Sequence, residues 1–405
     1  MHLAYTDDEE QLRKQLRDYY DGLLDDDTRR ELRHAEGIGR VMRRVVRQMG
    51  ADGWLGIGWP TVYGGQGRGP VEQFIFFDES MRAGAPVPML TINSVAPTLM
   101  NYGSDEQRQR FLPQILRGEI HFCIGYSEPG AGTDLASLRT RAVRDGDDYV
   151  VTGQKMWTSL ASDADYCWLA VRTGEDDSRH RGISILIAPM DSPGIERMPL
   201  RLLSSHDICA VHWDDVRVPA ANLVAGENHG WKLITSQLNH ERVTLCSPGM
   251  AEQMLHETIE WARSTTLPGS GHRVIDQQWV QLNLAKAYAG FEFLRLANWK
   301  VAWDATRGAL DVADASTIKV FGTEHYLETF RLLMEVLGER SYLTEGAPGA
   351  VLGSRLEQMY RSLLILTFGG GTNELQRDLI ATFGMGMPMA KRSGHGTGDP
   401  TWTST

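Results

Sequence analysis

The chain has little of what disulfide-linked and metal-binding proteins need. It holds four cysteines in 405 residues, and no pair of them has the Cys-x-x-Cys or Cys/His spacing of a zinc site. We therefore expect free, buried thiols at all four positions, Cys123, Cys167, Cys209 and Cys246. The 12 histidines form no His-x-x-x-His or His-Glu-x-x-His pattern, so the sequence predicts no metal site.

Basic charge and long apolar runs are also scarce. Asp and Glu number 52 against 41 Lys and Arg, which gives a net charge of −11. Phosphate affinity comes largely from basic side chains, so a nucleic-acid partner is not expected. No apolar stretch has the length of a membrane span, and the acidic start MHLAYTDDEEQLRKQL lacks the apolar segment of a secretion signal. We expect a cytoplasmic protein with no membrane partner.

The chain instead has the composition of a multidomain globular protein, with 42% hydrophobic and 23% charged residues. Residues 1–120 have helical patterns, including a capping box at Ser104–Gln107 before an apolar helix face. Residues 121–225 carry short β-rich runs separated by turns, which predicts a small β-barrel or sandwich. Residues 226–390 return to long helical patterns, which predicts a bundle, and residues 391–405 form an expected flexible tail. The predicted fold class is α+β.

A loop rich in small residues follows one of the predicted strands. Residues 126–134 read YSEPGAGTD, a tight path with exposed backbone N–H groups beside the hydroxyls of Ser127 and Thr133. Such a loop suits a phosphate or the polar edge of a ring, and a plain turn fits it as well. It is not Gly-x-Gly-x-x-Gly, and no strand–helix–strand unit surrounds it, which argues against a nicotinamide site.

Two further segments combine glycine or tryptophan with hydroxyls. Residues 153–159 read GQKMWTS, in which Trp157 and the hydroxyls after it suit the face and edge of a flat ring; a half-buried strand Trp is the plain alternative. Residues 368–377 read FGGGTNELQR. Glycines before a helix capped by Thr372 leave backbone N–H groups for an anion or carbonyl, and a structural turn rarely needs three glycines.

The order of these segments along the chain carries a family resemblance. A fourth segment, Asn239-His240-Glu241-Arg242, lies on the stretch 233–262, which is expected to be a long helix. Taken alone, its Glu-Arg pair indicates a solvated ion pair. Together the segments resemble the acyl-CoA dehydrogenase family from about residue 5 to 390. The resemblance implies an N-terminal helical domain, a middle β-domain and a C-terminal four-helix bundle, with FAD between them.

The resemblance also implies which residues contact FAD. It assigns this role to Tyr126, Ser127, Gly132, Thr133, Trp157, Ser159, Thr372 and Glu374. Trp157 resembles the ring that packs near the isoalloxazine, and Ser159 stands where the family has a hydroxyl bonded to it. The family usually has Gln at the position of Glu374, which puts that contact in doubt.

The catalytic base is expected at a less common position. Most family members carry a catalytic Glu where this chain has Gly370. A minority places the base in a Glu-Arg pair on a bundle helix, which corresponds to Glu241-Arg242. A carboxylate can remove the α-proton of a thioester while hydride leaves the β-carbon for the flavin. Burial would raise the pKa of such a base, and a backbone N–H near Gly370 would stabilise the enolate-like oxygen.

Two departures concern segments that, in the family, act at the FAD site of a neighbouring subunit. The Arg-x-x-Phe-Gly element is absent from residues 264–273, which read STTLPGSGHR, and Gln-x-x-Gly-Gly is replaced by Glu335-Val336-Leu337-Gly338-Glu339. The carboxylates of Glu335 and Glu339 would repel the pyrophosphate of the neighbour's FAD. The chain thus resembles the base-bearing subunit of actinobacterial α2β2 steroid side-chain acyl-CoA dehydrogenases. That resemblance implies a related partner subunit, a bulky acyl-CoA substrate such as a steroid side-chain CoA ester, and an electron-transfer flavoprotein as acceptor.

Two alternatives stay open at this stage. A flavin oxidase or monooxygenase of the same fold would lack the dehydrogenase Glu and would form peroxide or an oxygenated product in air. A non-catalytic subunit would complete a partner's site. The loss of the trans-acting Arg argues against that role.

Overall fold

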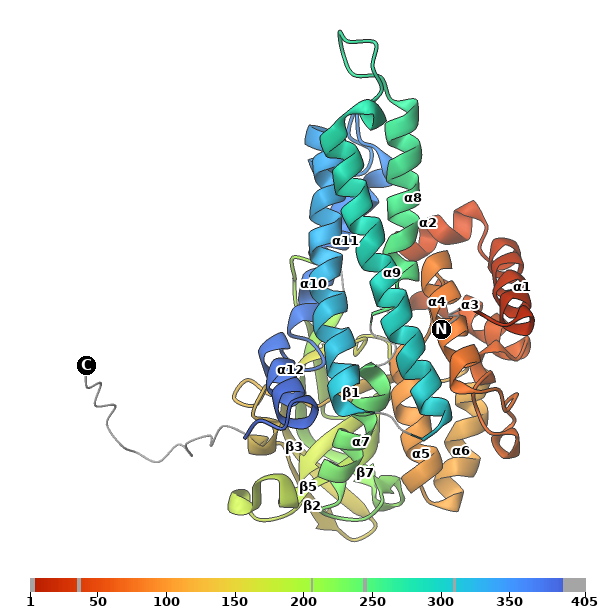
Figure 1. The fold of residues 1–405 in the computed structure, drawn as a ribbon. Coiled ribbons are helices and arrows are strands. Elements are labelled where there is room, and N and C mark those ends of the chain that lie inside the picture. Colours follow the sequence, from red (N-terminus) through yellow and green to blue (C-terminus); the bar gives the residue numbers. More distant parts are fainter. Residues whose placement is uncertain (1–3, 35–37, 205–206, 243–245, 309–310, 389–405) are drawn as a thin grey trace.

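The computed structural model describes residues 4–34, 38–204, 207–242, 246–308 and 311–388. The expected tail at 391–405 lies outside the described residues. Figure 1 shows a tall helical bundle, shorter N-terminal helices along one side of it and a sheet beneath. This arrangement is the α+β architecture that the sequence predicts.

Helices make up the N-terminal part. They are α1 (Asp7–Leu23), α2 (Asp26–His34), α3 (Gly39–Ala51), α4 (Pro70–Ala83), α5 (Ala96–Tyr102) and α6 (Asp105–Leu116), with a π-helical turn η3 (Leu90–Val95) before α5. The predicted capping box begins α6: Ser104 Oγ accepts from the Gln107 N–H, and the Gln107 side chain accepts from the Ser104 N–H. Phe111, Leu112 and Ile115 form its buried face.

One mixed sheet forms the middle part. Its strands are β1 (Phe122–Gly125), β2 (Arg141–Asp145), β3 (Asp148–Ser159), β4 (Tyr166–Arg172), β5 (Ile183–Pro189), β6 (Ile195–Pro199), β7 (Ile208–Pro219) and β8 (Leu223–Val224). The order is β6-β7-β3-β2-β4-β5-β8, and β1 pairs with β4 in parallel.

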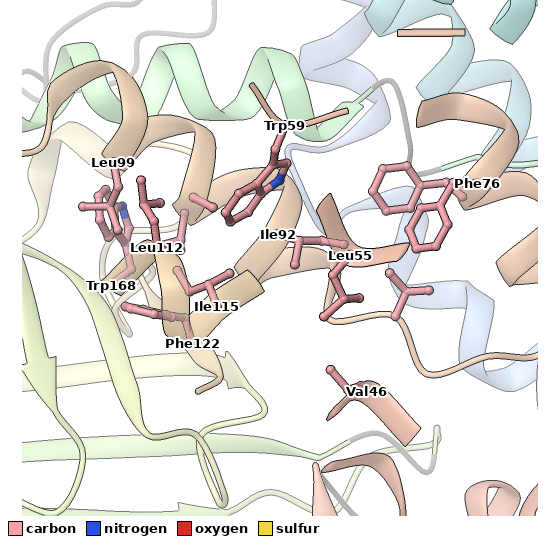
Figure 2. Close-up of a cluster of buried hydrophobic side chains, with 14 of the residues drawn as sticks. Val46, Leu55, Trp59, Phe76, Ile92, Leu99, Leu112, Ile115, Phe122 and Trp168 are labelled. Atoms are coloured by element: carbon pink, nitrogen blue, oxygen red, sulfur yellow. The ribbon is translucent and has the colours of Figure 1, made fainter. Parts of the chain in front are cut away.

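Strands β4 and β5 are buried on both faces. Trp168 of β4 and Ile185 of β5 belong to the core shared with the N-terminal helices, whereas Leu169 and Leu186 belong to a second core on the other face. This explains their continuous apolar runs. Figure 2 shows Trp168 and Phe122 of the sheet among side chains of the N-terminal helices, including Leu112 and Ile115 of α6. The sheet and helices therefore share one apolar core.

The C-terminal part is a bundle with its own apolar core. Its helices are α7 (Gly230–Arg242), α8 (Gly249–Ser264), α9 (Gln278–Thr306), α10 (Val312–Leu337), α11 (Arg355–Leu363) and α12 (Asn373–Leu379). The expectation of one long helix over 233–262 is wrong. Pro248 is the N-cap of α8, and because proline disfavours a helical residue before it, α7 and α8 are separate. Helix α7 packs between η3, β5 and α10.

All four cysteines are buried free thiols, as the sequence predicts. In the described ranges, no helix combines the length and apolar character needed to cross a membrane.

Candidate active site

A cavity of about 820 Å³ lies between the sheet and the C-terminal helices. It brings together most of the residues that the sequence singled out, although they come from three separate segments. Those that line it are Ser127, Gly132, Thr133, Trp157, Ser159, Gly370 and Thr372. Tyr126 and Glu374 are not among its lining residues. Glu241 and Arg242 end α7, but their side chains lie outside what the structure describes.

A buried ion pair holds the loop at 126–134. Lys155 is fully buried, and its Nζ lies 2.8 Å from Glu128 Oε1 and donates to the Tyr126 carbonyl at 3.1 Å. Glu128 also accepts from the backbone N–H groups of Arg139 and Thr140, at 2.6 and 2.9 Å. Burial works to raise the pKa of Glu128, but Lys155 and these hydrogen bonds outweigh it and leave the pKa lowered. The loop is therefore fixed to strand β3 through Glu128, its third residue.

Trp157 is turned into the cavity by a break in strand β3. Regular alternation would put Trp157 on the same side as Lys155, which is two residues earlier. The register with β7 shifts between Lys155 and Thr158, and Trp157 adopts a left-handed φ of 63°. Its side chain is 55% exposed. A non-glycine residue pays about 1–2 kcal/mol for that backbone conformation, and such strain clusters at functional sites.

The triglycine loop is held by a second buried lysine. Lys319 of α10 donates to the Gly371 carbonyl at 2.8 Å and to Asn373 Oδ1 at 2.6 Å, and it is fully buried. Gly370 and Gly371 have left-handed φ values of 68° and 94°, which favour glycine. Thr372 caps α12 by accepting from the Leu375 N–H at 3.2 Å, as the sequence predicts. Sequence reasoning missed Lys319 and Lys155, since lysine normally indicates surface.

The cavity suits a flat ring with polar edges and a charged tail. Trp157 and Phe368 expose aromatic surface, at 55% and 59%, and both line the cavity. Ser127, Thr133 and Ser159, which carry hydroxyl groups, also line it. Aromatic faces beside hydroxyls and glycine-loop N–H groups can bind a heteroaromatic ring and phosphates.

Tyr126 points elsewhere, toward helix α7. Its hydroxyl donates to Gln237 Oε1 at 2.5 Å and accepts from the Trp168 indole N–H at 3.2 Å. Gln237 lies one helical turn before Glu241. The side chain of Tyr126 thus links the sheet to the helix that carries the predicted base, a role that sequence reasoning missed.

The two segments that depart from the family pattern lie at the far end of the bundle. Residues 264–273 form a turn with a bridge between Thr266 and Arg273, and Figure 1 shows it projecting beyond α8 and α9. Glu335 is near the end of α10 and accepts from Asn283 Nδ2 at 3.0 Å. It also pairs with Arg331. Neither segment lines this chain's own cavity.

Comparison with known proteins gives one consistent family. Three family models match in chain order: acyl-CoA dehydrogenase N-terminal domain at residues 6–119, middle domain at 123–216 and C-terminal domain at 228–385. The chain is 55% identical to acyl-CoA dehydrogenase FadE26 of Mycobacterium tuberculosis, over 97% of this chain and all of that protein.

Two solved structures are similar over almost the whole chain. The ChsE4-ChsE5 complex from Mycobacterium tuberculosis contains a chain that is 55% identical, with a TM-score of 0.90, covering 96% of this chain and 100% of that one. A structure described as the Tcur3481-Tcur3483 steroid ACAD gives 46% identity and a TM-score of 0.90, with the same coverage.

Proposed function

The chain belongs to the acyl-CoA dehydrogenase family, and we propose that it binds FAD, uses Glu241 as its base and acts on a bulky acyl-CoA such as a steroid side-chain CoA ester. Dehydrogenation of an acyl-CoA between its α- and β-carbons follows from the family itself. The convergence of Ser127, Trp157 and the triglycine loop on one cavity carries the proposal.

The residues around the cavity fit a flavin. Trp157 would cover the ring system, Ser159 and Ser127 would bond to its polar edge, and Gly132, Thr133 and Thr372 would meet the rest of the dinucleotide. The exposed indole of Trp157 in the cavity supports this interpretation. FAD, when bound, accepts hydride from the β-carbon of the thioester. Glu374 is exposed, so its contact would be at the edge of the site.

The chain's own residues supply the proton chemistry. Removal of the α-proton needs a carboxylate near the α-carbon and donors for the charge that develops on the thioester oxygen. Glu241 would take the proton, and Arg242 would accompany it as the charged neighbour. The backbone N–H groups of the loop at Gly370 would stabilise the oxygen. Glycine at that position also leaves space beside the substrate.

The substrate class is open to a direct test. The flavin-loaded enzyme is mixed without oxygen with straight-chain, branched and steroid side-chain CoA thioesters, and bleaching of the oxidised flavin is followed. We expect the steroid ester to reduce the flavin fastest. Faster reduction by a short straight-chain ester would refute the bulky-substrate proposal, and peroxide formation in air that outpaces transfer to an electron-transfer flavoprotein would favour an oxidase.

We further propose a related acyl-CoA dehydrogenase subunit as partner and an electron-transfer flavoprotein as electron acceptor. Both solved relatives are named as pairs of proteins. An apolar stripe on α9 supports an assembly, because its members recur at heptad spacing and are each 44–54% exposed. They are Trp279, Leu282, Phe293, Leu296 and Trp303.

Flavin content tests the partner. The carboxylates at Glu335 and Glu339 and the missing Arg leave this chain poorly equipped to complete a second copy's site. The chain expressed alone should therefore purify with little flavin, and co-expression with the related subunit should restore one flavin for each base-bearing chain. A fully yellow homodimer would contradict the proposal.

A further inference from the structure

The carbonyl groups of the triglycine loop are turned into the bundle and bonded there. The Gly371 carbonyl accepts from Lys319 Nζ at 2.8 Å, and the Gly370 carbonyl accepts from Gln376 Nε2 at 3.4 Å. A peptide group is planar and trans, so its N–H points in the direction opposite to its C=O. The N–H groups of Gly371 and Thr372, which belong to these two peptides, therefore point away from Lys319 and Gln376.

The cavity lies beside these N–H groups. Gly370, Gly371 and Thr372 all line it, and the N–H groups of Gly371 and Thr372 have no acceptor among the residues that the structure describes. Successive free N–H groups in a turn form a concave site for a negatively charged oxygen. The loop thus has the geometry to meet such an oxygen from within the cavity.

Lys319 places a positive charge behind the loop. The side chain is 0% exposed, and its Nζ bonds to the carbonyls of Thr367 and Gly371 and to Asn373 Oδ1, at 3.3, 2.8 and 2.6 Å. Three acceptors match the three N–H donors of an ammonium group. Burying an ammonium costs more free energy than burying a neutral donor, and a neutral side chain would be enough if the loop needed only to be tied to α10. The charge itself therefore needs a purpose.

We propose that Lys319 is a positioning residue that adapts the triglycine loop to the charge on the thioester oxygen. It fixes the direction of the Gly371 peptide, and its charge polarises that peptide toward the cavity. This inference rests on the proposed function. In that reaction the α-C–H bond breaks, its electron pair moves toward the thioester oxygen and the proton passes to the base. Lys319 itself would touch neither the thioester nor the flavin.

A β-oxoacyl-CoA thioester isolates this effect from the rest of the reaction. Its β-carbon carries no hydrogen, so no hydride can leave, and its α-proton is acidic because both carbonyl groups share the charge of the enolate. The assembled, flavin-loaded enzyme is titrated with this probe over a range of pH, and the enolate is followed by its absorbance. The titration gives the apparent pKa of the bound probe and, at low pH, the dissociation constant of its neutral form.

Loss of the ammonium should weaken the enolate and spare the neutral probe. Lys319→Met should reduce stabilisation of the bound enolate about tenfold to a hundredfold, the range of a hydrogen bond that involves a charged group, and so raise the apparent pKa of the probe. The dissociation constant of the neutral form should stay within about twofold, because an uncharged oxygen gains little from the nearby charge.

Matched variants separate the charge from the fold. Thr329 is also fully buried on α10, where its hydroxyl bonds to His325 Nε2 at 3.3 Å, so Thr329→Val should leave the pKa of the probe unchanged. Lys319→Gln keeps a neutral donor and removes the charge, and it should raise that pKa in the same direction. If Lys319→Met does not fold, Lys319→Gln decides the question.

Two results would overturn the inference. An unchanged probe pKa in the Lys319 variants would mean that the lysine only ties the loop to α10. Loss of FAD affinity with an unchanged probe pKa would mean that its charge serves the phosphates of the cofactor. Failure of the proposed function looks different, because the unsubstituted complex would then bind the probe without forming its enolate and would be reduced by no thioester.

Discussion

The buried pair between Lys155 and Glu128 allows a quantitative prediction about the loop at 126–134. Lys155→Met keeps the volume of the side chain but leaves the Glu128 carboxylate, 8% exposed, without its counter-charge. Breaking a buried pair by removing one partner costs about 3–5 kcal/mol. Glu128 keeps two backbone donors, from Arg139 and Thr140. We therefore expect a loss near the lower limit, about 3 kcal/mol in the free energy of unfolding.

Urea unfolding followed by circular dichroism measures this loss in the flavin-free chain. A second substitution provides the control: Glu128→Gln in the Lys155→Met background removes the unpaired charge, so the double variant should regain about 1.5 kcal/mol or more. A loss below about 1 kcal/mol for Lys155→Met, or a double variant no more stable than the single one, would refute the reasoning.

The same pair gives a pH dependence with a defined sign. Burial opposes ionisation of Glu128, but Lys155 and the hydrogen bonds outweigh it, so the pKa of Glu128 is lower in the folded state than in the unfolded state. Its contribution is therefore present above the unfolded pKa and is lost as pH falls through the folded pKa. Lys155→Met should weaken or reverse this acid sensitivity, which unfolding midpoints between about pH 3 and 7 would reveal.

Three further substitutions test other parts of the account. Trp157→Gly removes the indole ring from a residue whose φ is left-handed. The unfolding free energy of the flavin-free chain should therefore change by less than about 1 kcal/mol. The affinity for FAD, measured by fluorescence titration, should fall at least about tenfold. A larger loss of stability with unchanged affinity would contradict the placement of this ring. Gly371→Ala puts a Cβ 2.6 Å from Gln376 Nε2 at a φ of 94° and should destabilise by about 1–3 kcal/mol. Gly130→Ala should be neutral in the same thermal melt, because its Cβ would meet no described residue within 4 Å apart from its chain neighbours. Equal effects of the two alanines would count against the strained loop. Phe293→Asp should abolish assembly with the related subunit in light-scattering measurements, because it charges a half-exposed apolar stripe, while Val62→Asp, at an 80% exposed position, should not. Normal assembly of the Phe293 variant would show that α9 is not an interface.

The sequence predicted those features that depend only on residues close together in the chain. The capping box at Ser104–Gln107 and the cap at Thr372 are local, since each needs only a side chain and a backbone N–H three residues away. The separate β-rich runs likewise predicted a β-domain, a small barrel or sandwich, between helical parts, and the structure has one eight-stranded sheet there. The break between α7 and α8 was not predicted, although it also has a local signal, Pro248.

Features set by tertiary contacts could not be read from one sequence. The outward turn of Trp157 depends on a register shift against β7, and alternation within β3 alone predicts the opposite side. Lys155 and Lys319 are buried because partners distant in sequence supply acceptors. The Tyr126 hydroxyl bonds to Gln237, 111 residues away, which no local pattern could show, and the expected contact of Tyr126 with FAD stays a prediction. Glu241 as base remains a prediction.

We propose that this chain carries the base of the assembled enzyme. The most direct measurement uses a complex in which only this chain carries Glu241→Gln and the related subunit is unchanged. Flavin content and anaerobic flavin reduction by the best thioester are measured on the same sample. We expect full flavin occupancy and a reduction rate at least about a thousandfold lower, because the carboxylate that takes the α-proton is gone. Full occupancy with an unchanged rate would instead mean that the base is another residue or lies on the partner, and Glu241 would then not be the base.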